Sequence, residues 1–168
     1  MAKKVLIVDD EESVVQSIAG VLEDEGFQVA QAKGGEEAIK VFQEEEPDVT
    51  LLDIWMPGMD GIEVLKRLKW IAPDSQVIMI SGHATISTAM TSVKLGAFDF
   101  IEKPLSLDVL LTTIRRALDH QRELVTVQQS NEMVPEELVQ DHKMLPREKS
   151  EELTGPPRTS LGEAIAPA

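Results

Sequence analysis

Residues 5–13 read VLIVDDEES, in which four aliphatic side chains are followed directly by four carboxylates. The aliphatic run is mostly β-branched and does not alternate with polar residues, which is typical of a strand buried on both faces of a parallel sheet. Adjacent carboxylates repel, and burying even one is costly unless a cation lies close to it. The stretch therefore predicts either a solvated acidic cluster or a cation site. Glu11 and Glu12 are expected to form the exposed acidic first turn of a helix, outside such a site.

Similar apolar runs recur along the chain. Four more strands are predicted, at residues 27–32, 49–52, 77–80 and 98–101. After each strand, apolar side chains follow helical spacing, in segments that begin near residues 14, 38, 62, 86 and 107. Five strands that alternate with five helices predict an α/β fold in which helices cover both faces of a parallel sheet.

The composition excludes several classes of function. The 168 residues include 30 acidic and 16 basic side chains, and the net charge is −14. A nucleic-acid backbone requires clustered Lys and Arg, so we expect no direct binding of nucleic acid. No apolar stretch approaches the roughly 20 residues of a membrane span, and no signal-peptide cleavage site follows the N-terminus. The absence of cysteine excludes disulfides and thiolate metal sites. The expected location is the cytoplasm, with no membrane contact.

The composition changes after about residue 123. No aromatic residue follows Phe100, and five of the nine prolines lie beyond residue 134. Such a segment cannot bury much apolar surface. We predict that residues 1–123 form the folded domain. Residues 124–168 are expected to extend the last helix and to continue as a largely disordered, Pro-containing linker or tail.

Polar side chains lie at the carboxyl ends of the predicted strands. Asp9 and Asp10 end the first strand, Asp53 ends the third, Ser81 ends the fourth, and Lys103 follows the fifth. Ligands of open parallel sheets bind beyond these strand ends, where the strand order reverses. If the first and third strands are neighbours, three carboxylates converge. Oxygen ligands without His or Cys favour Mg²⁺ over a transition metal.

A carboxylate–Mg²⁺ cluster that faces a hydroxyl and an ammonium group suits a phosphoryl group. The metal and Lys103 would neutralise phosphoryl oxygens, and the Ser81 hydroxyl would donate a hydrogen bond. Asp53 would then be the nucleophile toward phosphorus, as carboxylates are in aspartyl-phosphate enzymes. The sequence has neither a P-loop nor a G-x-G-x-x-G motif, so a bound nucleotide is not the obvious phosphoryl source.

Four motifs together resemble the receiver domain of bacterial two-component response regulators. They are VLIVDDEE (5–12), LLDIWMPGMDG (51–61), ISGHAT (80–85) and GAFDFIEKP (96–104). Each motif is weak alone, but the ordered set is specific and covers roughly residues 3–123. The segments DIWMPGMDG and SGHAT are most similar to receivers of the nitrogen-regulatory class. The resemblance implies a flavodoxin-like, doubly wound (βα)5 parallel sheet with strand order 2-1-3-4-5.

The resemblance also implies a phosphorylation-dependent switch. Asp53 would accept a phosphoryl group from a sensor histidine kinase or a phosphotransfer protein. Asp10 and Asp53 would ligate Mg²⁺ together with the backbone carbonyl of Trp55, and Asp9 would act largely through water. The protein would therefore not be an enzyme in the usual sense. It would be a phosphoryl acceptor that assists its own Mg²⁺-dependent phosphorylation and dephosphorylation.

The resemblance assigns the remaining motif residues to the conformational switch and to the control of acyl-phosphate hydrolysis. Lys103 would contact the phosphate, and Ser81 would shift toward it. Phe100 would rotate inward to fill the space that Ser81 vacates. Trp55 and His83 would flank the acyl phosphate and tune its hydrolysis.

The readout surface is expected over residues 86–118. This face would form a homodimer, or would dock a partner or an output domain missing from this chain. An alternative is a receiver-like interaction module that does not use phosphate, but such a module would normally lack one of the residues Asp10, Asp53 and Lys103. An aspartyl-phosphate phosphatase would usually carry a second Asp two positions after its nucleophile, where this chain has Trp55.

Overall fold

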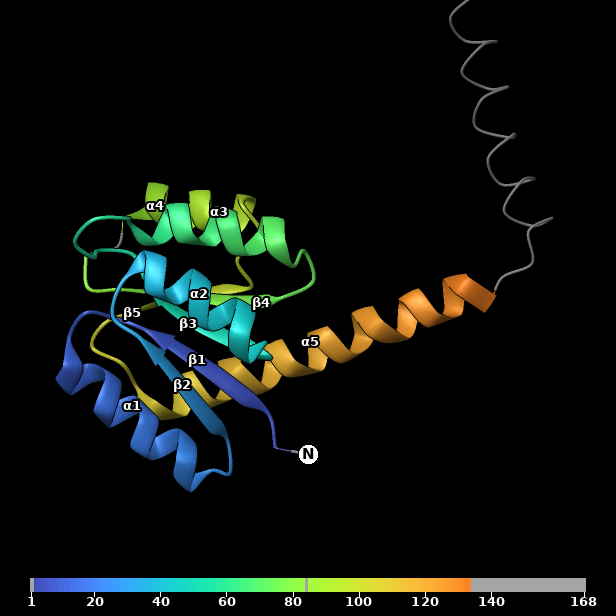
Figure 1. The fold of residues 1–168 in the computed structure, drawn as a ribbon, viewed down its shortest axis with the longest axis horizontal. Helices are drawn as coiled ribbons and strands as arrows, with labels where there is room; N and C mark the ends of the chain where they lie inside the picture. Colours follow the sequence, from blue (N-terminus) through green and yellow to red (C-terminus); the bar gives the residue numbers. More distant parts are fainter. Residues whose placement is uncertain (1, 84, 134–168) are drawn as a thin grey trace, which may run out of the picture. The chain divides into compact units, whose positions relative to one another are not determined.

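A computed structural model of the chain describes residues 2–83 and 85–133. Its five parallel strands form one sheet in the order β2-β1-β3-β4-β5 (Figure 1), so the predicted doubly wound fold is confirmed. The strands are β1 (Lys4–Val8), β2 (Gln28–Ala32), β3 (Val49–Asp53), β4 (Gln76–Ser81) and β5 (Asp99–Glu102). The helices are α1 (Glu12–Asp24), α2 (Gly35–Glu45), α3 (Gly61–Ile71), α4 (Ile86–Lys94) and α5 (Leu107–Met133).

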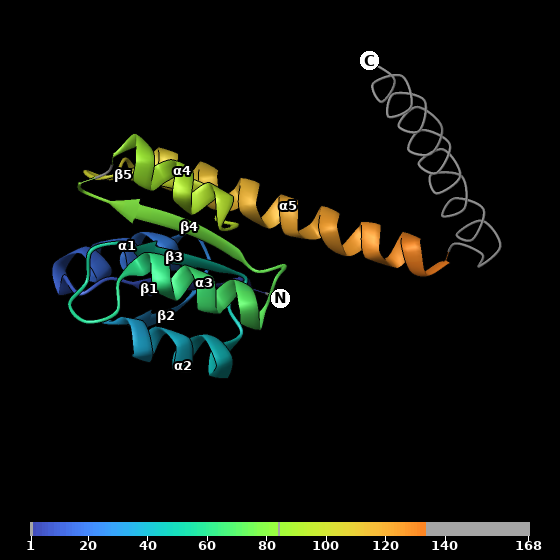
Figure 2. The same cartoon turned by 90° about the horizontal axis from the view of Figure 1, so that it is seen from above.

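The sheet separates two apolar cores. Alternate strand residues such as Val5 and Ile7 pack with α1 and α5, whereas Leu6 and Val8 pack with α2 and α3 on the opposite face. Figures 1 and 2 show the helices divided between the two faces in this way. All four of these β1 side chains are at most 1% exposed. This burial explains why the strand sequence does not alternate between apolar and polar residues.

Helix ends follow local signals in the sequence. The side chain of Asp60 caps α3, and the side chain of Thr85 caps α4, each by accepting a hydrogen bond from the backbone N–H three residues further on. After α1 and α4, the chain turns at Gly26 and Gly96, whose φ angles are +92° and +103°. Glycine is common just after a helix end because it adopts a positive φ without steric strain.

Helix α4 departs from the expected packing. Its apolar residues recur at helical spacing, yet Ile86, Met90 and Val93 are 82%, 54% and 56% exposed. The buried residue of this helix is Ser92, whose hydroxyl donates to the Thr88 carbonyl at 3.0 Å. Because α4 packs beside the short edge strand β5, only a narrow stripe of the helix meets the sheet. An apolar surface is left exposed over α4.

The chain divides into two compact units, residues 1–124 and 125–168. Helix α5 begins in the first unit and runs to Met133. The tail predicted to be disordered lies mostly at residues 134–168, outside the described residues, and so remains a prediction. None of the described helices combines the length and the apolar composition needed to cross a lipid bilayer.

Thr50 provides a test of the packing in β3. It is fully buried, and its hydroxyl has no hydrogen-bond partner among the described residues. A buried unsatisfied polar group costs about 1–3 kcal/mol, and Val has nearly the same shape without the hydroxyl. We therefore expect Thr50→Val to raise the free energy of unfolding, measured by urea denaturation, by about 1 kcal/mol.

The matched control is Thr113, which is also buried but whose hydroxyl donates to the Val109 carbonyl at 2.7 Å. Removal of this satisfied hydroxyl in Thr113→Val should lower the free energy of unfolding by about 1 kcal/mol. Effects of the same sign in both variants would contradict the assignment of Thr50 as unsatisfied.

Candidate functional site

The register of the sheet aligns the predicted site residues at one edge. Val8 of β1 is opposite Leu52 of β3, so Asp9 and Asp53, which follow them, lie at the same level. Ser81 ends β4 one residue beyond the residue that pairs with Asp53. The buried aliphatic faces fix this register, because a slip of one residue would turn every apolar side chain to the wrong face.

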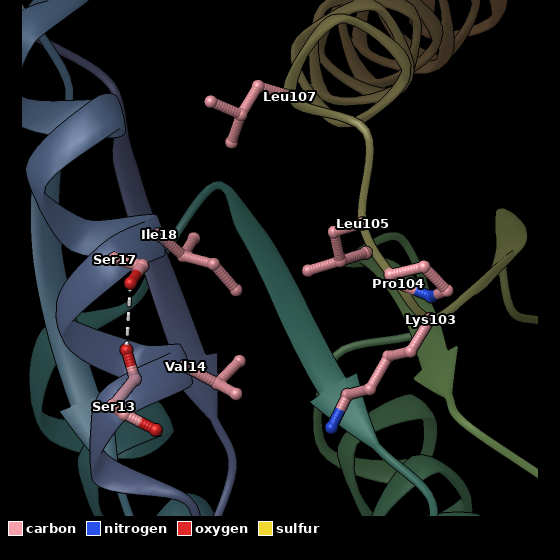
Figure 3. Close-up of a pocket in the computed structure, with 8 residues that line it drawn as sticks. All are labelled: Ser13, Val14, Ser17, Ile18, Lys103, Pro104, Leu105 and Leu107. Atoms are coloured by element: carbon pink, nitrogen blue, oxygen red, sulfur yellow. Dashed lines mark hydrogen bonds between the residues drawn. The ribbon is translucent and has the colours of Figure 1, made fainter.

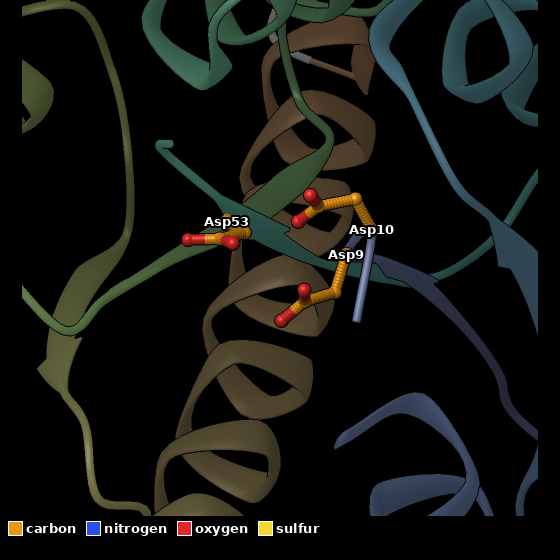
Figure 4. Close-up of side chains that lie close together, drawn as sticks. All are labelled: Asp9, Asp10 and Asp53. Carbon is orange, nitrogen blue, oxygen red and sulfur yellow. The ribbon is translucent and has the colours of Figure 1, made fainter. Parts of the chain in front are cut away.

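Asp9, Asp10 and Asp53 converge at this edge (Figure 4). One carboxylate oxygen from each residue lies within 4.8 Å of those from the other two. Asp9 and Asp53 are buried, with 3% and 4% of their surface exposed, whereas Asp10 is exposed. These three groups offer only carboxylate oxygens, which are the ligands that a hard divalent cation such as Mg²⁺ prefers. The cluster is therefore able to hold a metal ion.

The ammonium group of Lys103 lies among these carboxylates. Its Nζ donates to Asp9 Oδ2 at 3.0 Å and to Asp53 Oδ2 at 3.5 Å. Burial lowers the pKa of Lys103, but the hydrogen bond to Asp9 and the surrounding carboxylate charges outweigh burial, so the pKa lies above its ordinary value. Lys103 therefore remains charged and offsets part of the negative charge of the cluster.

The charge on Asp53 is only partly compensated. Burial, together with the nearby charge of Asp9, raises the pKa of Asp53 from 3.8 to about 6. The charge of Lys103 and a hydrogen bond from the Trp55 backbone act in the opposite direction but are weaker. A further cation bound beside Asp53 would therefore stabilise its ionised form. The electrostatics and the oxygen ligands thus both fit a divalent metal.

Ser81 and Lys103 join the ends of β4 and β5. Ser81 is fully buried, and its Oγ accepts a hydrogen bond from the His83 N–H at 3.1 Å. Its carbonyl accepts a hydrogen bond from the Lys103 backbone N–H at 2.8 Å. Phe100, on the neighbouring strand, is half-buried and lines a cavity of about 480 Å³ beside α4. The inward rotation expected for Phe100 remains a prediction.

The two predicted modulators lie at the rim of the site. Trp55 is 57% exposed and lines a hollow of about 250 Å³ between the start of α3 and helix α4. His83 is also exposed. Metal ligation by the Trp55 carbonyl, and the tuning of hydrolysis by both side chains, remain predictions.

A groove lies beside the site, between α1 and the segment that joins β5 to α5 (Figure 3). Its volume is about 340 Å³, and its walls are mainly apolar. The stem of Lys103 forms part of the wall, while the ammonium reaches the acidic cluster. The other lining residues are Ser13, Val14, Ser17, Ile18, Pro104, Leu105 and Leu107. The groove is thus linked to the acidic cluster through Lys103, whose Nζ lies 3.5 Å from Asp53 Oδ2.

Two features of the site were not predicted. Glu11 is exposed, as expected, but its carboxylate lies 3.8 Å from Lys103 Nζ, and its N–H donates to Asp9 Oδ1 at 2.9 Å. Gly61 begins α3 directly behind the third strand, where a Cβ would overlap the backbone carbonyl of Asp53. The glycine at position 61 is the sequence feature that could have indicated this close approach, whereas nothing in the sequence placed Glu11 near residue 103.

Known sequences resemble this chain over most of its described part. The family described as "Response regulator receiver domain" matches residues 5–115. The nitrogen assimilation regulatory protein NtrX of Azorhizobium caulinodans is 43% identical over 121 residues, which are 71% of this chain and 27% of that protein. The chemotaxis protein CheY of Bacillus subtilis is 38% identical over 120 residues, which are 71% of this chain and 100% of that protein.

Solved structures show the same fold. A crystal structure of NtrX from Brucella abortus has a TM-score of 0.72 and 37% identity, and the match covers 77% of this chain and 29% of that one. A CheY-like receiver domain protein from Methanospirillum hungatei has a TM-score of 0.71 and 32% identity. The match covers 73% of this chain and 98% of that one. The chain spans 24–27% of the length of its curated NtrX and NtrX-like relatives.

The raised pKa of Asp53 predicts how stability depends on pH. Between pH 3.8 and about 6, the folded protein holds a proton that the unfolded chain releases. The free energy of unfolding should therefore fall as the pH rises through this interval, when divalent cations are chelated. In Asp53→Asn this loss disappears, so the free energy of unfolding of the variant should exceed that of the wild type at neutral pH by about 3 kcal/mol. Urea denaturation across the pH range measures both effects.

The control for this experiment is Asp119→Asn, which removes an exposed carboxylate of α5. It should leave the pH dependence as in the wild type, because this side chain lies in solvent on α5 and is not part of the acidic cluster. A wild-type unfolding free energy that rises with pH over the interval would contradict the assignment to Asp53.

Proposed function

The chain belongs to the family of response regulator receiver domains, and on this premise we propose that it is a phosphorylation-dependent switch of a two-component system in the bacterial cytoplasm. Asp53 would accept a phosphoryl group from a histidine kinase or a phosphotransfer protein. The observation that carries this proposal is the meeting of Asp9, Asp10 and Asp53, with Lys103 Nζ 3.5 Å from the Asp53 carboxylate.

In the transfer step, a carboxylate oxygen of Asp53 forms a bond to phosphorus. The bond between phosphorus and the donor's imidazole nitrogen breaks, and the imidazole keeps the electron pair. Lys103 would neutralise charge on the phosphoryl oxygens. Mg²⁺ held by Asp9, Asp10 and Asp53 would supply further positive charge there and keep Asp53 ionised. The protein assists its own phosphorylation and dephosphorylation, and it acts on no separate substrate.

The groove beside Lys103 is the surface that we propose for the phosphoryl donor. Its apolar walls come from α1 and from the segment that follows β5, so an apolar helix or loop of the donor would fit there. A donor in this position would lie next to the Asp53 carboxylate, because Lys103 lines the groove and contacts Asp53. The docked donor would also exclude water from the transfer.

Phosphorylation would change the partners of two side chains. Lys103 is bound to Asp9 and Asp53, and the Ser81 hydroxyl accepts from the His83 N–H, which leaves its own proton available to donate. Charge-assisted hydrogen bonds contribute about 1.5–3 kcal/mol each, so two new bonds to the phosphoryl group contribute roughly 3–6 kcal/mol. A shift of a population from 1:99 to 99:1 requires about 5.5 kcal/mol. The two hydrogen bonds are therefore just sufficient to drive such a population shift.

The face formed by residues 86–118 is the proposed readout. Both moving residues, Ser81 and Lys103, lie at the ends of the strands that lead into it. Exposed Ile86, Met90 and Val93 on α4 provide the apolar surface that a homodimer or a docking partner would cover. Because the chain spans only 24–27% of its NtrX and NtrX-like relatives, an output domain of a longer protein is a further candidate for this face.

Beryllofluoride, a stand-in for the phosphoryl group, tests the proposal. Trp55 lies at the site and reports on it, so the second tryptophan is removed in a Trp70→Phe background. We expect beryllofluoride to change Trp55 fluorescence only in the presence of Mg²⁺, and the change to be lost in Asp53→Asn. If beryllofluoride and Mg²⁺ leave Trp55 fluorescence unchanged while Asp53 is intact, the result would support instead a receiver-like module that does not use phosphate.

Ser81→Ala tests the coupling between the phosphoryl site and the readout face. Loss of one charge-assisted hydrogen bond of about 1.5–3 kcal/mol should lower the switch equilibrium roughly 10- to 150-fold, and so leave a partial switch. Amide NMR spectra of the beryllofluoride-bound protein report the population of each state. The control is Ser92→Ala, which removes a buried hydroxyl that bonds only within α4. A wild-type response in Ser81→Ala would refute the coupling.

A further inference from the structure

Helices α2 and α3 lie side by side on one face of the sheet and share a solvent-exposed surface that the proposed switch does not use (Figures 1 and 2). The surface lies on different helices from the readout face of residues 86–118 and from the groove beside α1. We call it the α2–α3 surface. Its defining exposed residues are Glu36, Lys40, Glu44, Lys66, Arg67 and Trp70.

Trp70 dominates this surface. Its side chain is 88% exposed, more than any other large hydrophobic residue in the described part of the chain. With Ile39 and Ile71 it lines a hollow of about 320 Å³ between the two helices. A Trp side chain buries about 150–250 Å² when covered, and Trp is enriched among the residues that dominate protein interfaces. The Trp70 ring can therefore act as an apolar anchor, and the hollow can receive such a ring from another molecule.

The two helices carry opposite charge. Helix α2 has four carboxylates and one lysine, and one of these carboxylates, Glu45, is bound to Lys4. Helix α3 has three cations, of which Lys69 donates to the Ser75 carbonyl, and one carboxylate, Glu63. Glu63 lies 3.6 Å from Arg67 within α3, but an exposed pair of this kind is weak and leaves both groups available. Basic helix α3 therefore stands out in a chain whose net charge is −14.

This arrangement is complementary to itself. A two-fold axis that runs along the helices, between α2 and α3, sets α3 of one copy against α2 of the other. Each basic helix then meets an acidic helix, and each Trp70 reaches the surface that contains the partner's hollow. From this complementarity we infer that the α2–α3 surface is an interface between two copies of this chain.

The inferred dimer is weak. Two helices of 11 residues each form a face on the order of 16 Å by 20 Å, well below the roughly 800 Å² per partner of a standard interface. We therefore expect association that exchanges rapidly, strengthens at high protein concentration, and weakens with added salt because charge pairs contribute to it. No residue of the phosphoryl site takes part, so Asp53→Asn should associate as the wild type does.

Charge exchange provides a sharp test by sedimentation velocity of the full chain, at micromolar to millimolar concentration and low salt. The variant Lys66→Glu/Arg67→Glu makes both helices acidic, and the variant Glu36→Lys/Glu44→Lys makes both basic. Each variant alone should be monomeric, and an equimolar mixture should restore the dimer. Recovery in the mixture also shows that both variants are folded.

Trp70→Ala tests the apolar anchor and should weaken association at least tenfold. Two controls are matched to these changes. Glu23→Lys reverses an exposed charge on α1, and Met90→Ser removes an exposed apolar side chain from α4. Both should associate as the wild type does.

A wild-type chain that stays monomeric up to millimolar concentration would overturn the inference. So would a dimer that survives Trp70→Ala and the charge reversals but is lost in Met90→Ser, which would place the contact on α4. Dependence of the dimer on Asp53 and Mg²⁺ would overturn it as well. Because the inferred dimer needs neither, a failure of the proposed switch in the beryllofluoride experiment would leave this result unchanged.

Discussion

Three carboxylates cannot share one edge of a sheet unless positive charge lies among them, and the rest of this site follows from that constraint. The parallel register brings Asp9 and Asp53 to the same level, and burial removes most of the water that would otherwise screen them. Lys103 is held by both acids and supplies one positive charge. Burial and the charge of Asp9 still raise the pKa of Asp53 in the presence of Lys103, so a second cation would stabilise the ionised carboxylate. A site built in this way is prepared for a divalent metal and, beside it, for a group whose oxygens carry negative charge.

This preparation has a cost in stability. A carboxylate whose pKa is raised by burial destabilises the folded state at neutral pH, and the rest of the sheet must compensate. The compensation comes from the strands themselves, since β1 and β3 present apolar side chains to helices on both faces. Gly61 shows the same compromise in the backbone, because α3 approaches β3 so closely that no side chain fits between them. Asp53 is held by a scaffold that would be more stable without its buried charge.

The helices around this site differ in how they pack and in what they expose to solvent. Helices α1 and α5 fill one core, and the groove between α1 and the start of α5 is bordered by Lys103. Helix α4 buries little and exposes an apolar surface. In the proposed switch, its packing on β5 is therefore the part of the domain best suited to change. Helices α2 and α3 are firmly packed inside and opposite in charge outside. The switch and the inferred contact between copies can therefore operate independently.

The sequence by itself determined the fold, because buried parallel strands and amphipathic helices have distinct periodicities and this chain alternates them five times. It also placed Asp9, Asp10, Asp53, Ser81 and Lys103 at strand ends, since position along a strand is a local property. Only the tertiary structure decided which groups touch across the sheet. The contact of Glu11 with Lys103, the orphaned hydroxyl of Thr50 and the exposure of the α4 stripe all depend on neighbours distant in sequence. Periodicity reports that a helix has an apolar side, but whether that side meets a core or faces water is settled by what lies opposite, and no local pattern carries that information.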